Sequence, residues 1–269
     1  MRLYLEVARK SFRRQMAYRT ANLAGIAVNF FFTCLRVFIF TSLYPLGHVL
    51  AHRTQVAGYN VSQIITYMCL TEALMMTAGA IGNWELMDSV MTGQVAMDLA
   101  RPWDFFFYWL SRNVGRAAYF ALFRGGPLFL LSWAIFHIQL MADGLTAALF
   151  LLSVCLAMLV SSALGFLINF TAMWTTDARG VAGMVNTVMW FFSGFLLPPE
   201  FLPRWLRTVV WWLPFQAQIY TPTTIYLDRV GGFERGRLLA LQALWALILM
   251  GVGKAMLAAG QRKLTIQGG

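Results

Sequence analysis

The chain has 269 residues, of which 59% are hydrophobic and 12% are charged, and it carries a formal net charge of +10. A soluble domain of this length could not bury so much apolar surface, so the composition excludes one and indicates a membrane protein. The positive charge does not indicate nucleic-acid binding, because the basic residues follow the distribution that orients membrane proteins. Three cysteines lie in apolar stretches without disulfide or metal-site spacing, so they predict no metal site. The chain is expected to bind no cofactor of its own.

Six apolar segments predict an all-α polytopic membrane protein with six transmembrane helices. Each segment is near the roughly 20 residues that a helix needs to cross the bilayer core. They cover approximately residues 22–45, 61–83, 115–137, 146–172, 181–197 and 238–259.

Lysine and arginine predict the orientation of these segments. They concentrate before the first segment, after the sixth, and in the connections after the second and the fourth. The short connections after the first and third segments hold only Arg53. Because lysine and arginine are retained on the cytoplasmic side, both termini are expected in the cytoplasm.

Residues 1–20 predict an amphipathic helix in the cytoplasmic headgroup layer. Apolar residues recur at helical spacing between Leu3 and Met16, and Arg9, Lys10 and Arg13 cover part of the remaining surface. Such a helix lies with its apolar side down and its cations toward anionic lipid. A basic tail that only sets the topology is the alternative.

The connection between the second and third segments is too long and too patterned for a simple linker. An amphipathic stretch begins at Glu85, Gly93 interrupts it, and a second apolar–acidic stretch ends at Arg101 and Pro102. A short helix that projects from the membrane could dock into a groove of a partner protein. An interfacial helix without a partner fits the pattern equally well.

Prolines mark a second unusual region. Five of the 8 prolines fall between residues 198 and 222 of an otherwise helical chain. Proline ends or kinks helices, and broken backbone within a bilayer is tolerated only against protein or a water-filled cavity. The predicted orientation puts this region on the extracytoplasmic side, opposite the connection that begins at Glu85.

Two opposite charges fall within the first two segments. Arg36 and Glu72 lie at depths that agree within about one helical turn, so we expect them to pair or to share a polar cavity. Both a structural ion pair and a role in the substrate pathway fit. An unpaired Glu72 facing a cavity would favour a cationic amphiphile. Arg124 and Lys254 also fall in apolar stretches, without an evident partner.

In their order and topology, these features resemble the membrane permeases of ABC-2 type transporters over nearly the whole chain. The resemblance is carried by the basic N-terminal helix, by Gly93 followed by Leu99 to Pro102, by the Ser193–Gly194 and proline signature, and by Leu213–Pro214–Phe215, which lacks the usual Asn. The opening Tyr18 to Gly25 looks more like a drug- or viologen-exporter branch than polysaccharide exporters.

The resemblance implies one transmembrane domain over residues 1–269. Its parts would be an interfacial helix at 1–20, a cytoplasmic coupling segment at 84–104, and an extracytoplasmic re-entrant helical hairpin at 198–236 between helices five and six. The residues implied in coupling to an ATPase are Glu85, Asp88, Gly93, Asp98, Arg101 and Pro102. Those implied in an extracytoplasmic gate are Ser193, Gly194, Pro198, Pro199, Pro203 and Pro214.

The resemblance also implies a complex in the bacterial plasma (inner) membrane, with two cytoplasmic ATPase subunits and a second permease that is identical or related. The chain has no G-x-x-x-x-G-K-[ST] motif, so ATP and Mg would bind to the ATPase subunits. The complex would export a hydrophobic or amphiphilic small molecule, a cationic drug among the candidates.

Two alternatives stay open. One is an ABC-2 exporter of a lipid-linked glycan. The other is an ATP-independent secondary transporter, which predicts an internal repeat with two broken helices in matching positions, whereas the sequence shows one such break. An intramembrane enzyme is not indicated, because the sequence contains neither H-E-x-x-H nor G-x-S-x-G.

Overall fold

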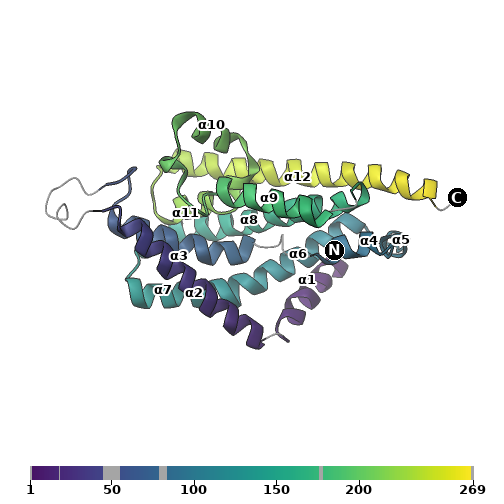
Figure 1. The fold of residues 1–269 in the computed structure, drawn as a ribbon, viewed down its shortest axis with the longest axis horizontal. Helices are drawn as coiled ribbons and strands as arrows, with labels where there is room; N and C mark the ends of the chain where they lie inside the picture. Colours follow the sequence, from purple (N-terminus) through teal and green to yellow (C-terminus); the bar gives the residue numbers. More distant parts are fainter. Residues whose placement is uncertain (1, 18, 45–54, 79–83, 176–177, 268–269) are drawn as a thin grey trace.

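The computed structural model describes residues 2–17, 19–44, 55–78, 84–175 and 178–267, and within them every element is helical apart from a single bridge between Val56 and Tyr59. The molecule is elongated (Figure 1). The α4–α5 pair and the C-terminal end of α12 lie at one end of the long axis, and α10 and α11 lie toward the other.

The helices follow one another along the chain with few long connections. They are α1 (Arg2–Gln15), α2 (Arg19–Thr41), α3 (Val61–Ala78), α4 (Glu85–Met91), α5 (Val95–Leu99), α6 (Phe105–Phe120), α7 (Gly126–Phe136), α8 (Gly144–Phe170), α9 (Ala178–Phe192), α10 (Arg204–Trp212), α11 (Tyr220–Tyr226) and α12 (Gly232–Gln267). A π-turn, Ala121–Gly125, joins α6 to α7 without a break.

Four helical stretches in the described residues are long and apolar enough to cross a membrane: Thr20–Thr41, Phe105–Phe136, Gly144–Met173 and Gly232–Arg262. They correspond to the predicted first, third, fourth and sixth segments. The second and fifth segments form the shorter helices α3 and α9, and residues 79–83 of the second lie outside the described residues. Six crossings therefore stay a prediction.

Several boundaries differ from the sequence prediction: the sixth segment begins at Gly232 rather than near residue 238, and two other shifts have a clear local cause. The third segment begins at Phe105 rather than near residue 115, because Asp104 caps the helix by accepting a hydrogen bond from the backbone N–H of Phe107 (3.0 Å). The fifth ends at Phe192 rather than near residue 197, because Gly194 adopts a left-handed conformation with φ of 82°.

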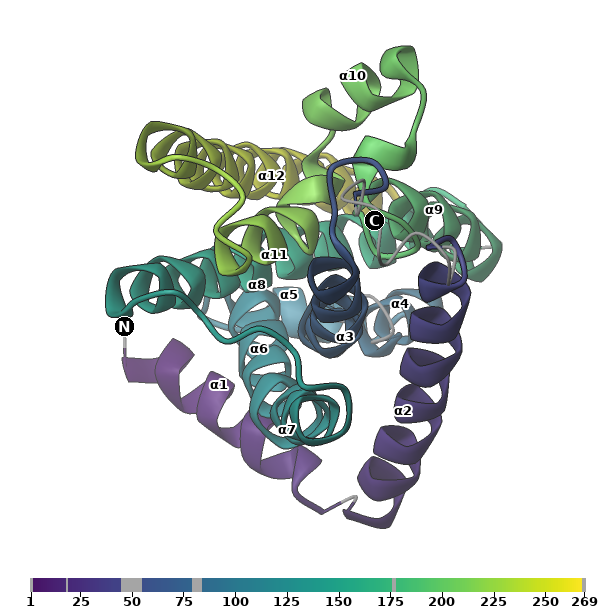
Figure 2. The same ribbon diagram turned by 90° about the vertical axis from the view of Figure 1, so that its left-hand side faces the viewer.

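Helix α8 is the centre of the bundle. It packs against α6, α11 and α12 (Figure 2). In its most apolar window 61% of the residues are buried, against 11% in α2 and 28% in α12. The apolar surface that α2 and α12 leave uncovered is what a bilayer would cover, since a soluble protein rarely exposes so much.

The proline-rich region folds into short helices rather than into an open loop. Tight turns at Pro199–Phe201 and Pro214–Ala217 flank α10, and α11 follows with all its residues buried. Helix α10 projects from the bundle (Figure 2) and exposes Trp205 and Trp212. That the region 198–236 re-enters a membrane stays a prediction.

Candidate functional site

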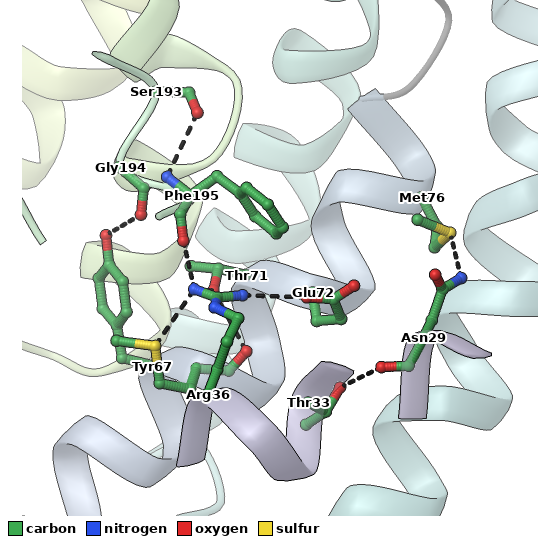
Figure 3. Close-up of polar contacts among 11 residues, drawn as sticks. Asn29, Thr33, Arg36, Tyr67, Thr71, Glu72, Met76, Ser193, Gly194 and Phe195 are labelled. Atoms are coloured by element: carbon green, nitrogen blue, oxygen red, sulfur yellow. Dashed lines mark hydrogen bonds and ion pairs between the residues drawn. The ribbon is translucent and has the colours of Figure 1, made fainter. Parts of the chain in front are cut away.

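Arg36 on α2 and Glu72 on α3 form an ion pair inside the bundle. Arg36 Nη1 lies 3.0 Å from Glu72 Oε2, and the two side chains are only 12% and 4% exposed (Figure 3). The charge of the Glu72 carboxylate is therefore compensated from within the chain. Two charges that are buried together in this way hold their helices in one relative position.

The second amino group of Arg36 connects this pair to a third element. Nη2 donates to the backbone carbonyl of Phe195, and it also lies 3.2 Å from Thr71 Oγ1. The guanidinium stands 4.4 Å from the centroid of the Phe195 ring, which is cation–π distance. Arg36, which lies on α2, thus contacts both α3 and the turn that follows α9 (Figure 3).

The turn at Ser193–Phe195 is held from two further sides. Tyr67 on α3 donates to the Gly194 carbonyl (2.6 Å), and the backbone N–H of Tyr220 on α11 donates to the Ser193 carbonyl (3.0 Å). A Cβ on Gly194 would lie 2.8 Å from Tyr67 Oη, so the close approach needs glycine as much as the positive φ does. Ser193 and Gly194 therefore adjoin the Arg36–Glu72 pair.

The four prolines assigned to the gate have separate places in this region. Pro199 and Pro214 begin the two tight turns, Pro203 precedes α10, and Pro198 precedes the first turn. Proline suits these positions because it fixes φ and because no helical hydrogen bond is lost there. They set the corners of the segment.

A polar cluster around Glu200 was not anticipated from the sequence. Tyr220 and Tyr59 donate to its two carboxylate oxygens at 2.8 and 3.2 Å, and Arg229 Nη2 lies 3.9 Å away. Burial, together with the neighbouring Tyr67 and Glu200, raises the pKa of Tyr59 well above its ordinary value, so its hydroxyl stays protonated and donates. Glu200 is the one acidic residue between positions 193 and 227 of the sequence, and this isolation could have marked it as the centre of a polar cluster.

The α4–α5 segment is fastened to the bundle by its charged residues. Glu85 pairs with Arg14 of α1 (3.0 Å) and with Arg112 of α6, and Asp88 pairs with Arg179 of α9 (2.9 Å). Two of the acidic residues implied in coupling therefore position α4 against three other helices.

The remaining residues implied in coupling lie at the tip of the segment. Gly93, with φ of 77° and no atom near its missing Cβ, separates α4 from α5. Asp98 lies 3.6 Å from Arg101 in an intrasegment pair, and Pro102 follows directly. The exposed side chains Met91 and Met97 give the tip an apolar surface.

Two apolar cavities open between the helices. One, of about 520 Å³, lies between α1, α6 and α8, with Tyr4, Leu5 and Phe107 in its wall. The other, of about 250 Å³, lies between α3, the π-turn and α8. The larger one falls within the volume range of small-molecule sites. In the described part of the chain, no group of His, Cys, Asp and Glu could hold a metal ion.

A family model described as "ABC-2 family transporter protein" matches residues 36–268, which is more than half of the chain. The chain belongs to the ABC-2 transporter family. It is a permease of ABC-2 type and a multi-pass membrane protein. Comparison with curated proteins gives no match.

The family accounts for the lack of a G-x-x-x-x-G-K-[ST] motif in the sequence. An ABC-2 permease is the membrane component of its transporter. This component generally lacks an ATPase site and works with a cytoplasmic ATPase. Lys254, which had no evident partner in the sequence, lies 3.7 Å from Asp104 at the start of α6.

Proposed function

We propose that this permease is the membrane subunit of an ATP-driven exporter in the bacterial inner membrane. It moves a hydrophobic or amphiphilic small molecule out of the cytoplasm or the inner leaflet. The chain crosses the membrane six times with both termini in the cytoplasm, and residues 198–236 form a re-entrant extracytoplasmic gate. Two ATPase subunits bind ATP and Mg, and a second permease, identical or related, completes the pathway.

The α4–α5 tip carries this proposal. It stands at the end of the molecule where α12 also ends (Figure 1), and it combines exposed Met91 and Met97 with ion pairs that anchor its other face. An apolar, flexible methionine surface on a short projecting helix suits insertion into a groove of a partner. A permease of this family without a phosphate-binding motif requires such a contact with its ATPase.

The same contacts give a route for motion across the protein. Asp88 on α4 pairs with Arg179 in the first turn of α9, and α9 ends at the turn that Arg36 and Tyr67 hold. A push on α4 is therefore transmitted along one rigid helix to Ser193 and to the proline segment beyond it. Closure of the ATPases around ATP supplies the push.

The apolar walls of the two cavities support a cargo that is apolar or has an apolar part. Glu72 does not favour a cationic cargo, since Arg36 neutralises its carboxylate. A resistance and accumulation assay with cationic, neutral and anionic compounds, together with an assay for lipid-linked glycan at the cell surface, separates the cargo classes.

Co-purification from native membranes tests the proposed function. The tagged chain should retain a cytoplasmic ATPase, and mutation of that ATPase's P-loop lysine should abolish export. The M91D/M97D variant should lose the ATPase while it stays in the membrane. The control W205S/W212S, which changes two exposed apolar residues on α10, should retain it. Export that persists without any ATPase would favour a secondary transporter instead.

A further inference from the structure

Three arginines, Arg112, Arg116 and Arg124, lie along the spanning stretch Phe105–Phe136, and two of them have no acidic partner within the described residues. Arg112 pairs with Glu85. Arg116 and Arg124 instead contact the ring of Phe120, with their guanidinium carbons 5.2 and 5.3 Å from its centroid. The Arg124 Nε atom is buried without a hydrogen-bond partner. A cation placed in this way within a membrane helix is costly and is usually functional.

A π-turn follows Phe120 and includes Arg124, so it changes the direction in which Arg124 leaves the helix. In a regular α-helix of 3.6 residues per turn, residue 124 would lie about 80° around the axis from residue 116. The i→i+5 hydrogen bonds at Ala121–Gly125 widen the turn and rotate Arg124 back. Both guanidinium groups reach the ring of Phe120, which lies four residues from each of them in the sequence. π-Turns occur frequently at functional sites, because they re-aim side chains in this manner.

Gly25 on α2 makes the space for Arg124. A Cβ at position 25 would overlap the Arg124 guanidinium, so any larger residue would displace that group. Gly25 lies about 9 Å along the helix axis from Arg19, where α2 begins. In the proposed orientation this is the cytoplasmic half of the bilayer. Helix α2 stands at the edge of the bundle (Figure 2) and is the least buried of the four spanning stretches. The seam between α2 and the spanning stretch Phe105–Phe136, where Gly25 meets Arg124, therefore lies next to lipid.

The charge balance of the membrane segments indicates what this seam binds. The buried carboxylate of Glu72 is already neutralised by Arg36, so the uncompensated charge in the described spans is positive. Guanidinium groups favour phosphate and carboxylate, to which they donate paired hydrogen bonds. The aromatic rings of Phe120 and of Phe123, which stacks on Tyr119, offer an apolar surface beside them.

We infer that Arg116, Arg124 and Gly25 form a binding site in the inner leaflet for an amphiphile with an anionic phosphate or carboxylate headgroup. The headgroup pairs with the two arginines and the chain lies along the aromatic rings. The role of this site as the first contact of an exported molecule rests on the proposed function. Headgroup binding itself does not, so it is measured without ATP and without the ATPase.

The first experiment compares headgroups on one chain length. The purified permease in dodecyl maltoside is titrated with dodecyl phosphate, dodecyltrimethylammonium and inorganic phosphate, and bound molecules are counted by native mass spectrometry. Dodecyl phosphate should bind at least roughly tenfold more tightly than the cation, the difference expected for one charge-assisted contact. Equal binding of the cationic amphiphile, or equal binding of inorganic phosphate, overturns the proposal.

Variants separate a built site from general attraction. R116Q/R124Q should lose the preference for dodecyl phosphate, whereas R116K/R124K should retain most of it. G25L keeps every charge but fills the space of the Arg124 guanidinium, so it should weaken binding by a similar factor. R204Q/R207Q, which removes two cations on α10, is the control and should bind like the unchanged protein. If G25L and R116Q/R124Q both bind normally, the arginines only extend toward the membrane surface.

A final comparison distinguishes a resident lipid from cargo. The permease is placed in nanodiscs of phosphatidylcholine alone or with phosphatidylglycerol. If phosphatidylglycerol leaves the binding of dodecyl phosphate intact, the site serves exported amphiphiles, and R116Q/R124Q should then reduce export of anionic compounds more than of neutral ones. If phosphatidylglycerol displaces dodecyl phosphate one for one, the site belongs to an anionic lipid and the cargo role is overturned.

Discussion

Arg36 and Phe195, 159 positions apart in the chain, are in contact through both backbone and side chain. The guanidinium donates to the Phe195 carbonyl and stands over its ring, while its other amino group pairs with Glu72. The turn that leads into the proline segment is therefore fixed to α2 and α3. Any movement of that segment relative to α2 must break this contact or carry α2 with it.

Removing either member of the Arg36–Glu72 pair should be strongly destabilising, because it leaves a buried charge without a partner. R36Q or E72Q alone should cost about 3–5 kcal/mol of unfolding free energy. R36Q/E72Q should cost less than the sum of the two, because no charge remains. The charge-reversed R36E/E72R variant should regain only part of the stability and export that the single reversals lose, since a glutamate at position 36 cannot donate to Phe195. Denaturation in detergent measures the stability of each variant, and an export assay measures its transport. Additive losses in the double variants would contradict pairing.

Gly194 should not tolerate alanine. The substitution forces a Cβ into a left-handed backbone and toward Tyr67 Oη, so G194A should lose roughly 1–3 kcal/mol of stability. G251A is the matched control, because Gly251 lies within α12 with nothing near its missing Cβ and should be neutral or slightly stabilising. Thermal unfolding of both variants gives the comparison. Equal midpoints would show that the turn is not constrained as described.

The Glu200 cluster should hold α11 and the first proline turn against the loop before α3. In E200A the hydroxyls of Tyr59 and Tyr220 lose their acceptor in a buried place, which should cost about 1–3 kcal/mol. Hydrogen exchange should rise in residues 198–226 in particular. E234Q, which alters an exposed pair with Arg237, is the control and should leave exchange there unchanged. Unchanged exchange in E200A would mean that packing alone holds the segment.

The sequence was most informative where one property dominates. Apolar runs predicted the helices, and the equal depth of Arg36 and Glu72 along two helices predicted their proximity. The contact of Arg36 with Phe195 could not be foreseen, because a carbonyl is present at every residue and only the turn at Gly194 aims this one. The π-turn that contains Arg124 could not be specified from the sequence: Gly125, Gly126 and Pro127 mark irregular helix there, but they do not say which hydrogen bonds shift.

The coupling segment shows a different limit. The family resemblance implied that its acidic residues contact an ATPase, yet Glu85 and Asp88 pair within the chain. An exposed acidic face looks the same in sequence whether a partner or a neighbouring helix covers it. Only the fold shows that Arg14, Arg112 and Arg179 come from three helices to meet it.

The Asp88–Arg179 pair should matter for coupling more than for stability. Both side chains are at least half exposed, so the pair contributes only about 0–1 kcal/mol to folding. It is nevertheless a direct link from α4 to the first turn of α9. D88R should therefore leave the unfolding midpoint nearly unchanged and keep the ATPase bound, but reduce export per ATP hydrolysed severalfold. D88R/R179D should restore the ratio, because the pair is re-formed with its charges exchanged. E6Q, which removes the exposed intrahelical pair with Arg9, controls for loss of a surface carboxylate. If D88R exports normally, or if the exchanged pair does not recover, motion reaches the gate by a route other than α9.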